Sequence, residues 1–356
     1  MRIIEPATER QSLKALLFRL LFGPADPAIL NDASSWNRIK RGAGSEGVAP
    51  IIAFSARAHV SQAERLWCDR VLAQSWHKHS ANLLHLRKIA ESLDVAGVPV
   101  IALKGPVSAL RHYDPPFLRK PSVDLDLAVR EEHIPAACAA LTRTGYRVCG
   151  SIARAIAGSH HVVLEHPSLP RVELHFRLSH GVSGVTVDRF FQRAVETEGP
   201  GGWRISVLHP ADELLHLVLH MVQDRFATAF HLYEVHRIWN KAPQTVRDEA
   251  IRIAVDNHFA GSLTLADAAV RLRSGHPLLP PGSLPKTWLH WRLNEDLYLA
   301  MESNAVVIAD RTLPGRLKGR WMDLQTTDRP ADLWRSLRGI ANVAVDSVWP
   351  HRLSAR

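Results

Sequence analysis

Cysteine is scarce in this chain of 356 residues. Cys68, Cys138 and Cys149 are an odd number of cysteines at wide spacing. They form no C-x-x-C pair, so the sequence gives no sign of a cysteine-ligated zinc site or a dithiol redox motif. Buried, reduced thiols are the expectation, as in a cytoplasmic protein.

Long apolar runs are also missing, and none reaches the length that crosses a bilayer. The most apolar N-terminal segment, Leu13–Phe22, is interrupted by Lys14 and Arg19 and lacks a small-residue cleavage site. These features favour a core helix over a signal peptide. We therefore expect a cytoplasmic protein with no membrane partner.

Acidic residues are too few to balance the basic ones. Lysine and arginine total 44 against 35 acids, which gives a formal charge of +9. Such a balance suits an anionic partner, such as a nucleotide, a nucleic acid or a membrane surface, although many bacterial proteins are basic without one. With 46% hydrophobic residues, the chain can bury a sizeable core and is long enough for two domains.

Patterns of apolar and turn-forming residues divide the chain into three regions. Residues 1–97 are predicted to be an N-terminal helical region, 98–202 an α/β core, and 203–356 a C-terminal helical region. Apolar residues at spacings of three and four predict a helix over 61–95 in the first region. The sequence Gly-Pro-Gly-Gly at Gly199–Gly202 marks the end of the core.

Strands alternate with helices in the core, which predicts a mixed α/β sheet. Segment 176–202 is predicted to be a less regular connection. In the C-terminal region, Pro210 followed by Asp212 and Glu213 is a helix-start signal. Further helices are predicted over 227–239, over 248–273 with an interruption at Gly261, over 293–307 and over 330–345.

Two closely spaced acids lie at the centre of the core. An apolar strand, Val98–Leu103, ends at a glycine turn, and a second strand, Ser122–Val129, carries Asp124 and Asp126. Side chains two residues apart lie on the same face of a strand, so the two carboxylates project together. Because they repel each other unless cations neutralise them, the pattern favours a divalent metal over acids that simply face water.

A third acid is available further along the chain. Segments 160–166 and 171–177 predict a pair of strands joined by a proline-containing turn. In the second of these, Glu173 lies between Val172 and Leu174 and therefore points away from them. If this strand neighbours the aspartate strand, Glu173 completes the acidic site.

Basic residues accompany the acids. Lys104 follows the first strand, where burial of its charge requires an anion, either a phosphate or one of the aspartates. Arg119 offers a bidentate fork to phosphate, or is a solvated loop arginine. Gly105 is expected to serve the turn and a close approach of the backbone to its neighbours.

These motifs together resemble the nucleotidyltransferase superfamily of DNA polymerase beta and the aminoglycoside-modifying enzymes. Leu103–Gly105 (LKG), Arg119, Asp124–Val129 (DLDLAV), Gly145-Tyr146 and Val172–His175 (VELH) are similar to a bacterial group of uncharacterised nucleotidyltransferases, over about residues 83–240. One departure is Gly105-Pro106, where the superfamily usually has Gly-Ser. The proline removes a hydroxyl and a backbone donor from the phosphate turn.

The resemblance implies a small mixed-sheet nucleotidyltransferase core, α/β in the α+β sense, flanked by helical regions. It implies Mg²⁺-dependent, or Mn²⁺-dependent, transfer of a nucleoside monophosphate from an NTP such as ATP to a hydroxyl or phosphate of a small-molecule or peptide acceptor. Asp124, Asp126 and Glu173 are the catalytic and metal-binding candidates. The nucleotide-binding candidates are Lys104, Gly105, Arg119 and Ser122.

Two alternatives from other classes remain. One is a degenerate relative that binds a nucleotide or a partner protein without turnover. The other is a nucleic-acid-binding module, which predicts a steep loss of affinity with salt. A basic stretch, Arg311–Arg320 beside Trp321, is compatible with single-stranded nucleic acid but more typical of a solvated loop.

Histidines in the C-terminal region form a separate candidate. His216 and His220 are spaced i and i+4 on one predicted helix behind Glu213, a spacing that can chelate zinc. The sequence lacks the H-E-x-x-H order and shows no obvious third ligand, so a packing or site-facing role is favoured. Similar candidates on the next helix are His231, Glu234 and His236.

Overall fold

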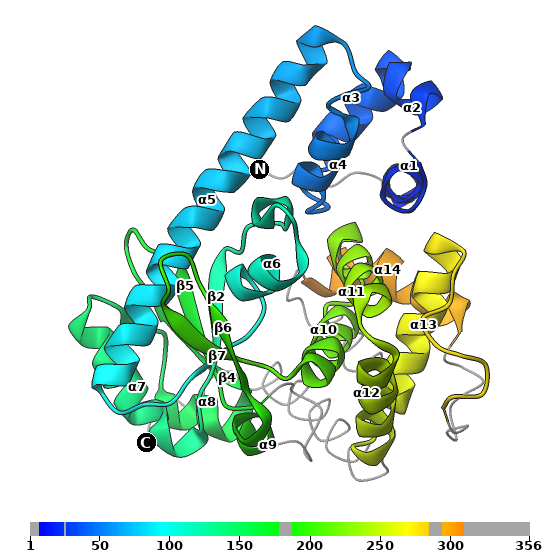
Figure 1. Cartoon of the computed structure of the whole chain (residues 1–356). Coiled ribbons are helices and arrows are strands. Elements are labelled where there is room, and N and C mark those ends of the chain that lie inside the picture. Colours follow the sequence, from blue (N-terminus) through cyan, green and yellow to red (C-terminus); the bar gives the residue numbers. More distant parts are fainter. Residues whose placement is uncertain (1–6, 25, 178–186, 285–293, 310–356) are drawn as a thin grey trace, which may run out of the picture. The chain divides into compact units, whose positions relative to one another are not determined.

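Helices predominate in the structure, a computed structural model that describes residues 7–24, 26–177, 187–284 and 294–309 (Figure 1). The strands of these residues form one mixed sheet of seven strands. The mixed α/β fold predicted from the sequence, α+β in its arrangement, is therefore confirmed. The helix predicted over 330–345 and the basic stretch 311–320 lie outside the described residues.

Contacts between Cα atoms divide the chain into two compact units. The sheet unit comprises Arg19–His180 and Gly184–Glu213, and the helical unit comprises mainly Met1–Phe18 and Leu214–Arg356. Helices α1 (Ala7–Phe22) and α10 (Pro210–Gln223) contribute residues to both. Over the described ranges, no helix combines the length and apolarity needed to cross a membrane.

The sheet unit begins with helices. They are α2 (Pro27–Asn31), α3 (Ala33–Gly42), α4 (Ala49–Ala56) and the long α5 (Gln62–Val95). Ser61 caps α5, because its Oγ accepts a hydrogen bond from the backbone N–H of Glu64. The chain leaves α5 at Gly97, whose φ of +66° is a left-handed conformation that glycine adopts at low cost. The helix predicted over 61–95 is thus confirmed.

The seven strands lie in the order β3, β4, β5, β2, β1, β7, β6. Their bounds are β1 Ile101–Ala102, β2 Asp124–Ala128, β3 Arg147–Val148, β4 His161–Glu165, β5 Arg171–His175, β6 Val195–Glu198 and β7 Arg204–Val207. Strand β2 is parallel to β5 and antiparallel to β1, and β4 is antiparallel to β5. The predicted strands around the three acids are present, while the first predicted strand, 98–103, keeps two residues in the sheet.

Short helices connect these strands. They are α6 (Pro106–His112), the 3₁₀ turns η1 (Pro116–Leu118) and η2 (Glu131–His133), α7 (Ile134–Arg143), α8 (Ile152–Gly158) and α9 (Val187–Arg193). The prediction that 176–202 is a less regular connection was wrong for its described part, which contains α9 and β6. Strand β6 is an edge strand with the exposed sequence Val-Glu-Thr-Glu, so it lacks the buried apolar alternation that identifies a strand. Gly199–Gly202 forms the turn into β7, with Gly201 and Gly202 at φ +84° and +79°.

Alternation along the central strands separates two faces of the sheet. Leu125 and Leu127 of β2 are buried and pack in one core with α5, α7 and the apolar residues of β5. Because successive side chains of a strand point to opposite faces, Asp124, Asp126 and Glu173 belong to the other face. We call this the acid face.

Helix α6 is tied to the start of α10 by a buried carboxylate. Glu213 accepts hydrogen bonds from Ser108 Oγ at 2.8 Å and from Arg111 Nη1 at 2.6 Å, and it lies 2.9 Å from His112 Nε2. Burial works to raise the pKa of Glu213, but the bonds and charges of His112 and Arg111 outweigh it and the pKa is lowered. Glu213 is therefore ionised and fully partnered.

Removing Glu213 is expected to destabilise the sheet unit. In Glu213→Ala, Arg111 and His112 lose their anion, and we expect the free energy of unfolding to fall by about 3 kcal/mol. Urea unfolding measures this change. Glu91→Ala is the control, because the exposed pair that Glu91 forms with Arg87 contributes less than about 1 kcal/mol. Equal losses in the two variants would contradict the expectation.

The helical unit contains α11 (Ala229–Lys241), α12 (Gln244–Asp256), α13 (Ala260–Ser274) and α14 (Glu295–Ala309). Leu13, Leu17 and Phe18 of α1 are buried, which confirms the predicted core helix. The interruption predicted at Gly261 was wrong, because Gly261 lies inside α13 and the break falls at 257–259. There His258 takes a left-handed φ of +61° and Phe259 N–H bonds back to the carbonyl of Ala254, which ends α12.

Candidate active site

The acid face is assembled by the parallel pairing of β2 with β5. In this register Asp126 lies opposite Glu173, and Asp124 lies opposite Arg171. Glu173 therefore neighbours the aspartates, although it follows them by about fifty residues. The Asp126 side chain is 6% exposed and that of Asp124 is 25% exposed, so the cluster is shielded at one end and open at the other.

Lys104 and Gly105 lie beside these acids. Lys104 Nζ is 3.3 Å from Asp126 Oδ2, so the pairing of the lysine with an aspartate is observed. Gly105 has φ +65° and ψ −130°, and a Cβ at this position would be 2.9 Å from Ser122 Oγ. Only glycine combines this backbone conformation with such a close approach. Lys104, Gly105 and Ser122 are thus brought together next to β2.

Arg119 lies in the sheet unit, close enough to α5 for its charge to act on His79. It follows η1 and is 5% exposed, so it is not a solvated loop arginine. Burial, together with the charge of Arg119, lowers the pKa of His79 on α5 to about 4. The role of Arg119 toward phosphate remains a prediction.

Three groups of the acid face were missed in the sequence, and Arg171 is the first. Its Nη2 is 3.3 Å from Asp124 Oδ2 and 3.1 Å from Glu173 Oε1, so the guanidinium joins the two carboxylates. The signal was present in Arg171–His175 (RVELH), where Arg171, Glu173 and His175 alternate with two buried apolar residues. Period-two alternation puts all three on one face.

His175 is the second missed group. Its Nε2 is 3.0 Å from Asp126 Oδ1 and 3.6 Å from Glu173 Oε2. Burial works to lower the pKa of His175, but the bonds to the two carboxylates outweigh it and the pKa is raised. His175 therefore sits between two carboxylates, and these carboxylates favour its protonated form.

His161 of β4 is the third. It pairs with His175 in the antiparallel register, and its Nε2 is 3.9 Å from Glu173 Oε2. Burial, with the charge of His175, lowers the pKa of His161. The ring of His160 lies 4.1 Å from that of His161 and 5.3 Å from that of His175, centroid to centroid. A group of histidines thus lines the side of the acid face toward β4.

The pKa values of Asp124 and Glu173 are shifted in opposite directions. Burial raises the pKa of Asp124, and the charges of Asp126 and Glu173 raise it further. For Glu173, burial acts in the same direction, but the interactions with His175 and His161 outweigh it and the pKa is lowered. Because the carboxylates of Asp124, Asp126 and Glu173 repel one another, a cation bound at the acid face would be stabilised.

The donor set fits a divalent cation. Asp126, Glu173 and His175 each offer one ligand atom, and these atoms lie within 4.8 Å of one another. Arg171 forms ion pairs with both Asp124 and Glu173. Carboxylate oxygens are the hard ligands that Mg²⁺ and Mn²⁺ prefer. The acid face therefore carries groups that could hold a divalent metal ion.

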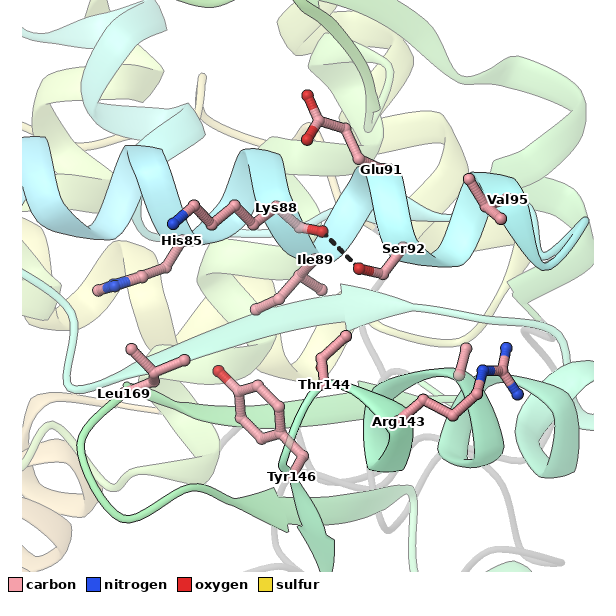
Figure 2. Close-up of a pocket in the computed structure, with 11 residues that line it drawn as sticks. His85, Lys88, Ile89, Glu91, Ser92, Val95, Arg143, Thr144, Tyr146 and Leu169 are labelled. Carbon is pink, nitrogen blue, oxygen red and sulfur yellow. Dashed lines mark hydrogen bonds between the residues drawn. The ribbon is translucent and has the colours of Figure 1, made fainter.

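A separate pocket of about 530 Å³ lies between α5 and the end of α7 (Figure 2). Its walls include Ile89, Val95, Tyr146 and Leu169. Ile89 and Tyr146 belong to the core that covers the face of the sheet opposite the acid face, so the acids do not line this pocket. Tyr146 Oη donates a hydrogen bond to the carbonyl of Pro170, which fixes the turn just before β5.

The packing role favoured for the histidines of the helical unit fits His216, which is buried in α10. His220 approaches Asp224 and His231. On α11, Glu234 is buried and His236 is hydrogen-bonded with Asn240. Asp224, in the turn after α10, is a group beside His220 that the sequence did not reveal.

In this sheet an Asp-x-Asp strand runs parallel to a strand with a third acid, beside a glycine turn. The arrangement is similar to that of the nucleotidyltransferases as a class. The family model described as uncharacterised nucleotidyltransferase matches residues 32–270, well over half of the chain, and the chain belongs to this family. None of the curated proteins matches it. Family membership supports nucleotidyl transfer as the general kind of reaction, with an NTP as substrate.

Proposed function

We propose that this protein is a metal-dependent nucleotidyltransferase with residues 98–202 as its catalytic core. It moves a nucleoside monophosphate from an NTP to a hydroxyl or phosphate of a small-molecule or peptide acceptor. The observation that carries the proposal is the parallel register of β2 and β5, which sets Glu173 beside Asp126 on the face that also carries Asp124. Lys104 and the Gly105 turn adjoin this face.

Asp124, Asp126 and Glu173 would hold the Mg²⁺ or Mn²⁺ ion, which when bound neutralises the triphosphate and polarises the reacting phosphoryl group. The chain supplies the rest of the electrostatics. Lys104 can exchange its aspartate for a phosphate oxygen, and Gly105, which has no Cβ, would let the backbone of the turn approach the phosphate closely. Arg171 holds Asp124 and Glu173 in place.

The transfer forms a bond between the acceptor oxygen and the α-phosphorus and breaks the bond from the α-phosphorus to the bridging oxygen. Pyrophosphate leaves with the electrons of that bond. When the acceptor is a hydroxyl, its proton passes to Glu173, whose lowered pKa keeps it ionised and able to accept. The buried side of the acid face limits access of water, which would otherwise compete with the acceptor.

The experiment that tests the proposal combines calorimetry of ATP binding with a pyrophosphate assay, each with Mg²⁺ and after chelation. Lysate supplies the acceptor, and the position of a label from the NTP identifies it. We expect metal-dependent release of pyrophosphate and a labelled product. ATP binding that is insensitive to Mg²⁺, with no pyrophosphate released for any NTP, would refute the enzyme.

A nucleotide binder without turnover is the second candidate. The observation that favours it is the number of basic groups already paired with the acids, namely Lys104, Arg171 and His175. These cations can offset the carboxylates without a metal. The same calorimetry separates the two candidates, because this binder holds ATP equally well after chelation.

Lys104 is expected to contribute to nucleotide affinity. In Lys104→Met, loss of a charge-assisted contact to phosphate raises the KM for the NTP by about 10- to 100-fold. Lys104→Arg keeps the charge and should retain most of the affinity. Steady-state kinetics with varied NTP measure the effect. An unchanged KM in the methionine variant would show that Lys104 serves Asp126 alone.

A further inference from the structure

A second group of side chains that can bind a metal belongs to the helical unit and shares no residue with the proposed active site. His220 is near the end of α10, Asp224 follows in the turn, and His231 lies on α11. One ligand atom from each of the three lies within 4.8 Å of the others. Two imidazoles and one carboxylate thus meet at one point.

The distances match the edges of a metal coordination shell. His220 Nδ1 is 3.1 Å from Asp224 Oδ2, and His231 Nε2 is 3.8 Å from the same oxygen. Zinc bonds of about 2.0 Å at tetrahedral angles separate neighbouring ligand atoms by about 3.3 Å. The two separations from Asp224 Oδ2 bracket this value, and the two imidazole ligand atoms lie within 4.8 Å of each other, so an adjustment of side chains would bring all three atoms onto one ion.

The His220 and Asp224 side chains are close without being bonded to each other. Although His220 Nδ1 is buried and only 3.1 Å from the carboxylate, it makes no hydrogen bond among the described residues. The two atoms are therefore near enough to share a ligand, but the N–H direction of the ring does not point at the carboxylate oxygen as a hydrogen bond requires. Both atoms are therefore close enough to bind one ion.

The backbone holds Asp224 in place. Its N–H donates to the carbonyl of His220, and the next two residues, Arg225 and Phe226, both take a left-handed φ of 54°. Such a conformation costs about 1 kcal/mol or more for each residue with a Cβ. It is maintained because Phe226 is buried against Tyr298 and its carbonyl accepts a hydrogen bond from Lys14 Nζ. The turn therefore fixes the position of the Asp224 backbone.

We propose that His220, Asp224 and His231 bind a divalent transition-metal ion of the zinc class. Imidazole nitrogens favour Zn²⁺, Co²⁺ or Ni²⁺ over Mg²⁺, so this ion differs in kind from the one proposed for the acid face. The side chains are 25%, 44% and 18% exposed, which leaves room for a water molecule or a ligand atom as the fourth donor. Three protein ligands and an open position are the pattern of zinc sites that take part in chemistry or bind a ligand.

The test uses the full chain, stripped with a chelator and titrated with Co²⁺ while the visible absorption is recorded, followed by displacement with Zn²⁺. The expected result is a Co²⁺ signal of nitrogen coordination in the unsubstituted chain. Asp224→Asn and His231→Ala should weaken Zn²⁺ binding at this site by at least about 100-fold. Zn²⁺ should also raise the Tm of the unsubstituted chain and leave that of Asp224→Asn unchanged.

Three control variants make the test specific. Asp256→Asn removes an exposed acid at the end of α12, and His236→Ala removes another histidine of α11, and neither should change the affinity. His161→Ala disrupts the histidine group of the acid face and should leave this signal in place. The proposal is overturned if Asp224→Asn binds Zn²⁺ as tightly as the unsubstituted chain, or if His161→Ala alone removes the signal. Nucleotidyl transfer is not measured, so this outcome is independent of the proposed function.

Discussion

Asp126→Asn and Glu173→Gln are each expected to lower nucleotidyl transfer by at least about 10³-fold, a loss of about 4 kcal/mol in transition-state stabilisation. Both substitutions preserve shape and remove a negative charge from the acid face. The register places these two carboxylates opposite each other, so in the proposed site each would supply charge for the same ion. Pyrophosphate release at saturating NTP measures the loss, and kcat should fall more than KM rises.

The matched control is Glu165→Gln. Glu165 lies on β4 in the same sheet, but its side chain is 52% exposed and pairs with Arg147 at the surface. This variant should keep full activity. Circular dichroism and the Tm of all three variants show whether the sheet remains intact. Folded Asp126→Asn and Glu173→Gln proteins that both retain activity would refute the assignment of the acid face.

The acid face could be predicted to the extent that its pattern is local. Period-two alternation within Asp124–Ala128 and Arg171–His175 is visible in the sequence. It predicts which face of its own strand each acid occupies. Whether the two strands pair with each other depends on contacts between distant parts of the chain, and the sequence pattern did not predict it. The same alternation contained Arg171 and His175, which were missed because only acids were sought.

Other features could not be predicted because no local pattern encodes them. Strand β6 is exposed at the sheet edge and shows no apolar alternation. The break between α12 and α13 depends on the left-handed conformation of His258, which non-glycine residues seldom adopt. Asp224 approaches His231 through a turn, so helical spacing, which identified His216 and His220, does not apply to it.

A buried ion pair in the helical unit is a further feature that no local pattern encodes. Its removal is expected to cause the largest change in stability. Lys14 interrupts an apolar stretch of α1 and, in the sequence, only argues against a signal peptide. In the structure its Nζ is 3.1 Å from Glu302 Oε1, a residue 288 positions away, and the two side chains are 2% and 4% exposed. Arg273 Nη2 and Tyr298 Oη complete the partners of this carboxylate, at 2.6 and 2.8 Å.

Glu302→Gln should lower the free energy of unfolding by about 3–5 kcal/mol, because Lys14 and Arg273 then share a buried site without an anion. Urea unfolding at neutral pH measures this loss. Glu295→Gln is the matched control on α14, because Glu295 pairs with Arg271 at the surface and its removal should cost less than about 1 kcal/mol. In Lys14→Met combined with Glu302→Leu, part of the loss should be recovered, since an apolar pair replaces the buried ions.

The pH dependence of stability provides a second measurement of the same carboxylate. Burial works to raise the pKa of Glu302, but the charges of Lys14 and Arg273 outweigh it, and the pKa lies below its ordinary value of 4.5. The stabilisation is therefore complete above this value and is lost as the pH falls through the lower pKa of the folded state. Glu302→Gln lacks this component, so the difference between it and the unsubstituted chain should shrink on acidification. A difference that stays constant from neutral pH to about pH 3 would show that packing, and not the charge of Glu302, stabilises this part of the helical unit.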